Sequence, residues 1–221
     1  INTEHTLVRK NGRNSAGSNV GSIPVIGGAV GEKYLVRLPG EERMWAKADQ
    51  IIDYSVPNLV NLNHSEHRDL YLDKAHYIAP LLSPRMLNQS AKARDVSKIF
   101  TFMSLPEGGD RRTEIIHGLN RSGVQTANIQ GLVGDVSEAM SRLGILLNLH
   151  QTDHHHTLEE LRVLPALLQG VLVVSEPSPL IEEVPYSRFI TFASIEEMPG
   201  ILSELLATYE KRWNETFASG E

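Results

Sequence analysis

The chain has 221 residues, a formal net charge of −6, 41 % hydrophobic and 22 % charged residues, and no cysteine. This size allows one large domain or two small ones, and the negative charge argues against a general affinity for nucleic acid. The absence of cysteine excludes disulfides and thiolate metal sites, and no apolar stretch approaches the roughly 20 residues of a membrane helix. We therefore expect a soluble, cytoplasmic protein without an integral membrane segment, with peripheral binding to a membrane left open.

The first half of the chain predicts a small lobe built from short elements. Residues 9–32 are rich in Gly, Ser and Asn, which indicates a long loop. Short strands are expected at 50–53 and 74–82, on either side of a helix at about 56–64. The polar stretch 88–95 is the expected domain boundary. The chain begins without a methionine, which is typical of a domain cut from a larger multidomain chain.

The second half alternates strands and helices, which predicts parallel βαβ units with helices on both faces of a sheet. Two of the expected helices end at a glycine, Gly123 and Gly170. The expected strands read as unbroken apolar runs, as in a sheet that is covered on both faces. These strands lie in “KIFTFMS”, “VQTANI”, “GILLNLH”, “VLVVSE” and “SRFITFA”.

The turn after the first of these strands, “SLPEGGDRRTE”, predicts a phosphate site. Ligands of open α/β sheets bind outside the carboxyl ends of the strands. Gly108 and Gly109 allow close approach to the backbone, and Asp110 can cap the following helix. Arg111 and Arg112 lie in the first helical turn, where cations are disfavoured unless an anion is bound. The alternative is an exposed glycine turn with solvated arginines, since neither a Walker lysine nor a GxGxxG motif is present.

The segment “TLEELR” predicts the start of another helix. Thr157 and Glu160 fit a capping box, with Thr157 as N-cap and Glu160 three residues into the helix. Glu159 then has no structural task, and its carboxylate could accept hydrogen bonds from both hydroxyls of a ribose. The alternative is a surface charge that is favourable at the helix N-terminus.

Several polar residues lie at the ends of the expected strands “GILLNLH” and “VLVVSE”. His150 and His154–His156, with Asp153, could bind a metal, but neighbouring loop residues point apart. Hydrogen bonding of one or two histidines to a phosphate or sugar is therefore favoured over a metal, with a solvated loop as the third interpretation. Ser175 and Glu176 end a strand at the same edge and fit either a ligand role or ordinary loop chemistry.

Four stretches of the second half together resemble a known family. They are “FTFMSLPEGGDRR”, “LLNLH”, “TLEELR” and “LLQGVLVVSE”. In this combination the second half resembles the donor-binding lobe of nucleotide-sugar glycosyltransferases of the GT-B type. The first half is similar to the end of the acceptor-side lobe of the same family, through “INTEH”, “ADQIIDYSVPN” and “YIAPLL”.

This resemblance implies an α/β fold of two Rossmann-like lobes with parallel sheets, of which the N-terminal lobe is small or incomplete. Residues 1–95 would form the acceptor-side lobe, with a mobile loop at about 9–32, and residues 96–205 would form the donor-binding lobe. Residues 206–221 would form a helix that crosses back to the first lobe.

The resemblance also implies transfer of a hexosyl or deoxyhexosyl group from a nucleotide-diphosphate sugar to a carbohydrate acceptor in glycan biosynthesis. It implies no metal and no cofactor besides the donor substrate. Stereochemistry stays open, because Gln151 and Thr152 stand where many retaining members carry a second glutamate. The candidates for a catalytic base are Asp53, Glu4 and His5. The residues assigned to the donor are Gly108, Gly109, Arg111, Arg112, Asn148, His150, His156, Glu159, Ser175 and Glu176.

The alternative, from a different class, is a non-catalytic α/β module that binds a nucleotide or a protein partner.

Overall fold

The computed structural model shows an α/β protein with parallel sheets, as in Rossmann-like folds. It describes residues 7–9, 34–36, 47–63, 68–80, 94–103, 105, 109–129, 136–151 and 158–218. The chain folds into two compact units. The first unit consists of Ile1–Pro80, His150–Glu160 and Ser178–Pro185, and the second of Leu81–Leu149, Leu161–Pro177 and Tyr186–Glu221. The first unit thus ends after Pro80 in the N-terminal half and includes two later segments, and the expected boundary at 88–95 stays a prediction.

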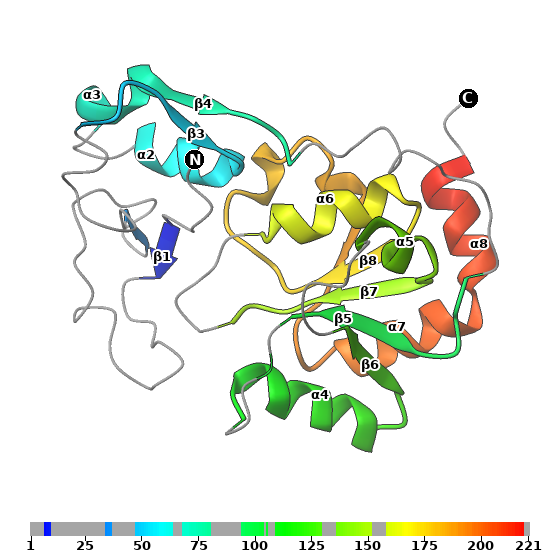
Figure 1. Ribbon diagram of the computed structural model, residues 1–221. Helices are drawn as coiled ribbons and strands as arrows, with labels where there is room; N and C mark the ends of the chain where they lie inside the picture. The colour runs from blue at the N-terminus through cyan, green and yellow to red at the C-terminus, as the bar shows by residue number, and fades with distance from the viewer. Residues whose placement is uncertain are drawn as a thin grey trace. The chain divides into compact units, whose positions relative to one another are not determined.

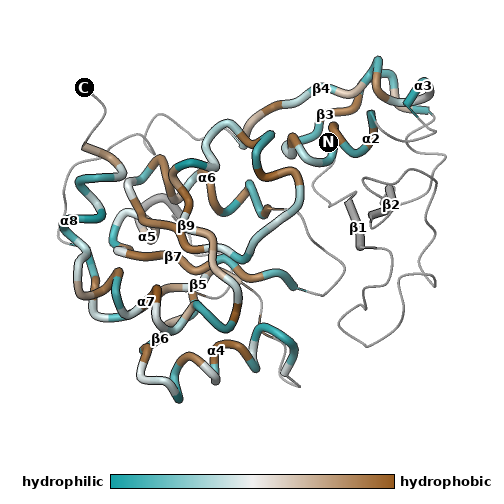
Figure 2. The backbone as a smooth tube through the Cα atoms, turned by 180° about the vertical axis from the view of Figure 1, so that it is seen from behind, coloured by the Kyte–Doolittle hydropathy of each residue, from teal (hydrophilic) through white to brown (hydrophobic). Residues whose placement is uncertain are grey.

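The second unit contains a five-stranded sheet in which all strands are parallel. Its strands are β5 (Ile99–Phe102), β6 (Thr126–Ile129), β7 (Ile145–Asn148), β8 (Leu172–Ser175) and β9 (Ile190–Phe192), in the order β6-β5-β7-β8-β9. All five strands were expected from the sequence, and β7 appears in hydrophobic brown in Figure 2. The order changes direction between β5 and β7, which is where open α/β sheets bind their ligands.

Helices cover both faces of this sheet, as the alternating pattern predicts. They are α4 (Arg111–Arg121), α5 (Val136–Ser141), α6 (Glu160–Leu168) and α7 (Met198–Ala207). Figure 1 shows α4 and α7 on one face and α5 and α6 on the other. The core on the first face joins Ile145 and Leu147 of β7 to Leu119 of α4 and Leu202 of α7. Because side chains alternate along a strand, the buried Leu146 points to the opposite face.

Capping residues fix the ends of two helices as the sequence predicts. Asp110 caps α4, because its carboxylate accepts a hydrogen bond from the Thr113 N–H at 2.9 Å. Gly123 (φ +91°) and Gly170 (φ +70°) follow the ends of α4 and α6 in the left-handed conformation that favours glycine.

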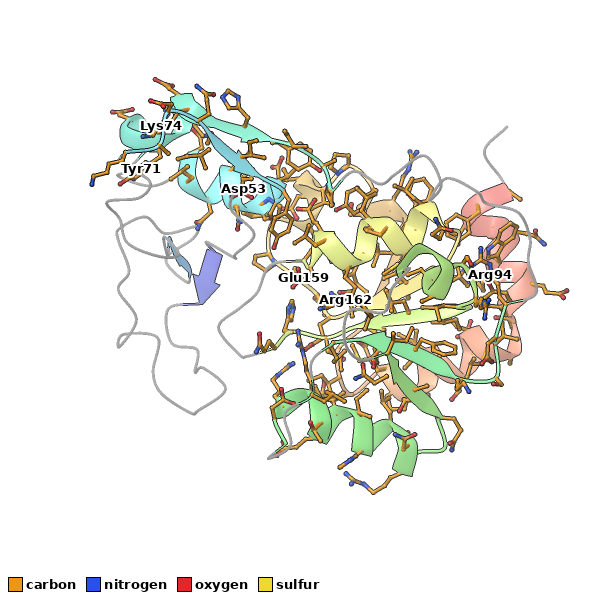
Figure 3. The ribbon with its side chains drawn as sticks, viewed as in Figure 1. Asp53, Tyr71, Lys74, Arg94, Glu159 and Arg162 are labelled. Carbon is orange, nitrogen blue, oxygen red and sulfur yellow. The ribbon has the colours of Figure 1, made fainter. Side chains whose placement is uncertain are left out.

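The first unit is smaller, and two strand pairs lie among its described residues. β1 (Leu7–Arg9) and β2 (Tyr34–Val36) are antiparallel, whereas β3 (Ile51–Asp53) and β4 (Ala75–Tyr77) are parallel. Between β3 and β4 the chain forms α2 (Val56–Asn63), α3 (Arg68–Tyr71) and the 3-10 helix η2 (Leu72–Lys74). Ile51, Leu62 and Tyr71 form its core, and the Lys74 ammonium lies 5.5 Å from the centre of the Tyr71 ring (Figure 3). The unit also includes the 3-10 helix η4 (Ile181–Glu183).

The C-terminal segment belongs to the second unit rather than to the first. After the 3-10 helix η5 (Ser187–Phe189), β9 and α7, the chain forms α8 (Tyr209–Trp213) and the π-helical turn η6 (Asn214–Ala218). The indole N–H of Trp213 donates to the carbonyl of Gly170 at 2.8 Å, and the Trp213 and Tyr209 rings pack against the core of this unit. These contacts lie within the second unit, and the expectation that residues 206–221 cross back to the first lobe stays a prediction.

A guanidinium group joins the ends of two helices in the second unit. Arg94 donates to the carbonyl of Leu143, which follows α5, at 2.9 Å, and also to the carbonyl of Gln169, which follows α6 (Figure 3). A cation is favourable at the C-terminal ends of helices. Burial lowers the pKa of Arg94 from its usual value. The side chain therefore has a structural role at the amino edge of the sheet.

Gly144, directly before β7, is expected to be the least replaceable of the glycines that the structure describes in the second unit. An added Cβ atom would lie 2.7 Å from Cγ1 of Val96 and 2.8 Å from the backbone oxygen of Asp95. Gly144→Ala should therefore lower the free energy of unfolding by about 1–3 kcal/mol, measured by urea denaturation. The control is Gly118→Ala in α4, where an added Cβ has no neighbour within 4 Å among the described residues. That variant should be neutral or up to about 1 kcal/mol more stable, and equal behaviour of both variants would contradict the prediction.

Candidate functional site

Polar side chains meet at the carboxyl ends of β7 and β8. Asn148 ends β7 and Ser175 ends β8, and the two residues are paired in the sheet. Both are buried. The Asn148 amide N–H donates to the Ser175 hydroxyl at 3.0 Å, and this hydroxyl donates to the carbonyl of Glu176 at 3.0 Å. Asn148 and Ser175, which the sequence assigned to the donor, therefore form one hydrogen-bonded pair.

Arg162, on α6, adds a third residue to this hydrogen-bonded pair. Its guanidinium donates to the Asn148 side-chain oxygen at 2.7 Å (Figure 3). The Asn148 amide therefore has its oxygen toward Arg162 and its nitrogen toward Ser175, which fixes its orientation. Arg162 was not among the predicted donor residues. The signal that could have identified it is a cation in the first turn of a helix, the same signal that selected Arg111.

Arg111 and Glu176 form an ion pair at the same edge. The two terminal nitrogens of Arg111 donate to the two carboxylate oxygens of Glu176, at 2.9 and 2.5 Å. Glu176 is buried, whereas about a quarter of the Arg111 side chain is exposed. Fork-to-fork pairs of this kind are strong and have a fixed geometry. We call the connected residues Arg162, Asn148, Ser175, Glu176 and Arg111 the edge cluster.

Arg112 has a different environment from its neighbour. It is 6 % exposed, and its Nε donates to the backbone oxygen of Leu149 at 3.1 Å. The bond links the first turn of α4 to the residue after β7. Arg112 therefore has a structural contact in the interior, and the expectation that it also binds a phosphate stays a prediction.

Asp53, the candidate catalytic base, has a structural role in the first unit. It is 1 % exposed and lies where β3 ends and the chain turns toward α2 (Figure 3). Its Oδ1 accepts hydrogen bonds from the Ser55 N–H at 2.8 Å and from the Asn58 amide at 3.1 Å, and the same amide lies 3.3 Å from Oδ2. Both oxygens thus accept hydrogen bonds in the turn into α2, and the assignment of Asp53 as a catalytic base stays a prediction.

Glu160 belongs to the same region of the first unit. It is fully buried; Oε1 accepts from the Val56 N–H at 3.1 Å and Oε2 from the Tyr77 hydroxyl at 3.5 Å. Burial, followed by the Glu160 charge and its hydrogen bond, raises the pKa of Tyr77 to about 12. Since α6 begins at Glu160 itself, the predicted capping box with Glu160 three residues into the helix is wrong. The carboxylate caps α2, which is 104 residues away in sequence.

Some of the remaining predicted residues lie within the described structure, and others lie outside it. Gly109 has φ +73°, which agrees with the expected glycine turn, and His150 is buried. Glu159 is half-buried directly before α6, and its predicted role with ribose stays a prediction. The following lie outside the described residues: Glu4, His5, Gly108, Asp153, His154, His155, His156 and Thr157.

Among the described residues, no group of three His, Cys, Asp or Glu side chains is arranged to hold a metal ion. Likewise, none of the helices in the described part of the chain has the length and apolar character needed to cross a membrane.

The chain is similar to a viral protein. The chain is 32 % identical over 175 residues to “Uncharacterized protein R358” of Acanthamoeba polyphaga mimivirus. The match covers 76 % of this chain and 57 % of the viral protein, so the chain spans little more than half the length of that relative. No family model matches the chain, and no solved structure matches it. The name of the viral protein states no activity, so functional inference depends on the site itself.

Proposed function

We propose that the chain is a GT-B-type glycosyltransferase that moves a hexosyl or deoxyhexosyl group from a nucleotide-diphosphate sugar to a carbohydrate acceptor. The observation that carries the proposal is the edge cluster. It places the guanidinium groups of Arg111 and Arg162 at the carboxyl edge of a parallel sheet, joined through Asn148, Ser175 and Glu176. β5 and β7, between which the strand order changes direction, end at this edge, as in sheets that bind nucleotides.

The chemistry of the edge cluster suits a diphosphate leaving group. Transfer of a sugar leaves negative charge on the phosphate oxygens, and fixed cations lower the energy of that charge in the transition state. Arg111 and Arg162 can supply these cations without a metal, because a guanidinium fork binds phosphate oxygens in a defined geometry. The buried hydrogen bonds of Asn148 hold Arg162 in place before the donor binds.

The alternative function is a nucleotide-binding module without transferase activity. One observation favours it: Asp53, the candidate base within the described residues, is buried in the turn into α2. Such a module would bind the donor and leave its sugar in place.

Thermal unfolding in the presence of nucleotides tests whether the chain has a nucleotide site, which both proposals require. A nucleoside diphosphate at about 100 times its dissociation constant should add roughly 2.7 kcal/mol of stability. Mass spectrometry of the same samples then tests whether a nucleotide sugar loses its sugar to water or to added oligosaccharides. Stabilisation with sugar release supports the transferase, and stabilisation without release supports the binding module. If no nucleoside diphosphate or nucleotide sugar stabilises the chain, both are refuted.

Nucleotide binding is expected to be independent of divalent metals. Arg111 and Arg162 provide positive charge at the edge cluster, so a bridging cation has no task there. Protein treated with EDTA should bind a nucleoside diphosphate as tightly as untreated protein in calorimetric titration. Loss of binding with EDTA, restored by Mg²⁺ or Mn²⁺, would contradict this expectation.

A further inference from the structure

The ion pair between Arg111 and Glu176 neutralises the guanidinium that the proposed function assigns to a phosphate. We propose that Glu176 is an internal counter-ion that competes with an anionic ligand for Arg111, and so sets the affinity of the edge cluster for diphosphates. This inference rests on the proposed phosphate-binding role of Arg111. It concerns a residue that would act by occupying Arg111, not by touching the sugar.

The geometry of the pair supports competition. Both terminal nitrogens of Arg111 are used by Glu176, at 2.9 and 2.5 Å, in the arrangement that a phosphate would also take. The pair has no net charge, so its attraction for an anion is much smaller than that of a lone guanidinium. A ligand that binds Arg111 with the same two nitrogens must therefore displace the carboxylate.

The burial of Glu176 makes this displacement costly. The side chain of Glu176 is 7 % exposed, whereas that of Arg111 is 25 % exposed. When Arg111 turns to a ligand, a buried carboxylate loses its cation, which is unfavourable in a medium of low dielectric constant. Part of the binding free energy of the ligand is thus spent on separating the pair, and removal of the Glu176 charge should remove that cost.

If Glu176 had a purely positioning role, its replacement would change the affinity for phosphate in the opposite direction. If Glu176 only held Arg111 in the orientation for phosphate, its replacement would weaken binding, because the guanidinium would lose its fixed direction. The sign of the change in affinity therefore decides between competition and positioning.

Calorimetric titration with inorganic pyrophosphate tests the proposal. Glu176→Gln should bind pyrophosphate about tenfold more tightly than the unmodified chain, the scale of one hydrogen bond to a charged group. The double variant Glu176→Gln with Arg111→Gln should bind no better than Arg111→Gln alone. The control is Glu204→Gln on the exposed face of α7, which changes the net charge equally and should leave the affinity within about twofold.

A second variant covers the case in which Glu176→Gln does not fold. Glu176→Asp keeps the charge but is one methylene shorter, so it weakens the pair, and its affinity for pyrophosphate should rise by a smaller factor. Unchanged or weaker binding in the folded variants overturns the proposal, as does a gain that persists without Arg111. Pyrophosphate carries neither nucleoside nor sugar. Tighter binding by the variants together with no response to any nucleotide would refute the proposed function and leave this inference intact.

Discussion

Replacing Glu160 with alanine is expected to lower the free energy of unfolding of the first unit by about 2–4 kcal/mol. The change removes a fully buried carboxylate that accepts hydrogen bonds from the Val56 N–H and the Tyr77 hydroxyl. Both donors are only half-buried, and a hydrogen bond to a charged group contributes about 1.5–3 kcal/mol. Urea denaturation followed by circular dichroism measures the loss, and a variant that unfolds at the urea concentration of the unmodified chain would contradict the prediction.

Glu160→Gln is the matched control, because it keeps the shape and one carbonyl oxygen while removing the charge. Its stability should lie between those of the unmodified chain and Glu160→Ala. It should also shift the titration of Tyr77, since the Glu160 charge and its hydrogen bond contribute to the raised pKa of that hydroxyl. The tyrosinate absorbance should then appear at lower pH in Glu160→Gln. An unchanged titration would show that burial alone holds the pKa of Tyr77.

The hydrogen-bonded pair of Tyr77 and Glu160 predicts that the free energy of unfolding falls at alkaline pH. Tyr77 has its pKa raised from 10.0 to about 12 in the folded unit. The unfolded chain therefore loses the hydroxyl proton at lower pH than the folded chain does. Its contribution to stability is complete below pH 10 and is lost progressively as the pH rises toward about 12. In Glu160→Gln this loss should end at lower pH, which urea denaturation at a series of alkaline pH values would show.

The local elements of the second unit could be predicted from the sequence because their signals lie within a few neighbouring residues. The apolar runs of β7 and β8, the Asp110 cap and the glycines after α4 and α6 are all of this kind. The parallel sheet follows from the alternation of these elements. The sequence did not reveal that β7 lies beside β5, which makes the change of direction in the strand order.

The roles of Asp53 and Glu160 could not be predicted because they depend on contacts distant in sequence. Glu160 caps a helix 104 residues earlier, so the nearby Thr157 offered a local but incorrect interpretation. Asp53 resembled a base at the end of a strand, whereas its carboxylate holds the next turn of the chain. The division into units depends on distant contacts as well, since His150–Glu160 and Ser178–Pro185 belong to a unit that begins far earlier in the sequence.

The difference between Arg111 and Arg112, in contrast, was present in the sequence. Arg112, Ile115, Ile116 and Leu119 are spaced as one stripe of a helix, and all four are buried. Arg111 lies about 100° away from that stripe, at the edge where Glu176 reaches it. Helical periodicity applied to charged as well as apolar residues would have placed Arg112 in the interior.

Arg112→Ala is therefore expected to lower the free energy of unfolding of the second unit by about 2–4 kcal/mol. The change leaves space where a buried side chain packed, and it removes the donor to the Leu149 carbonyl at 3.1 Å. Arg121→Ala, at the exposed end of the same helix, is the control and should change stability by less than about 0.5 kcal/mol. Arg112→Met, which keeps the apolar stem but donates no hydrogen bond, should fall between them, because it fills the space while the carbonyl stays unpaired. Equal stability of the Arg112→Ala and Arg121→Ala variants in urea would show that the bond to Leu149 does not hold α4 against the sheet.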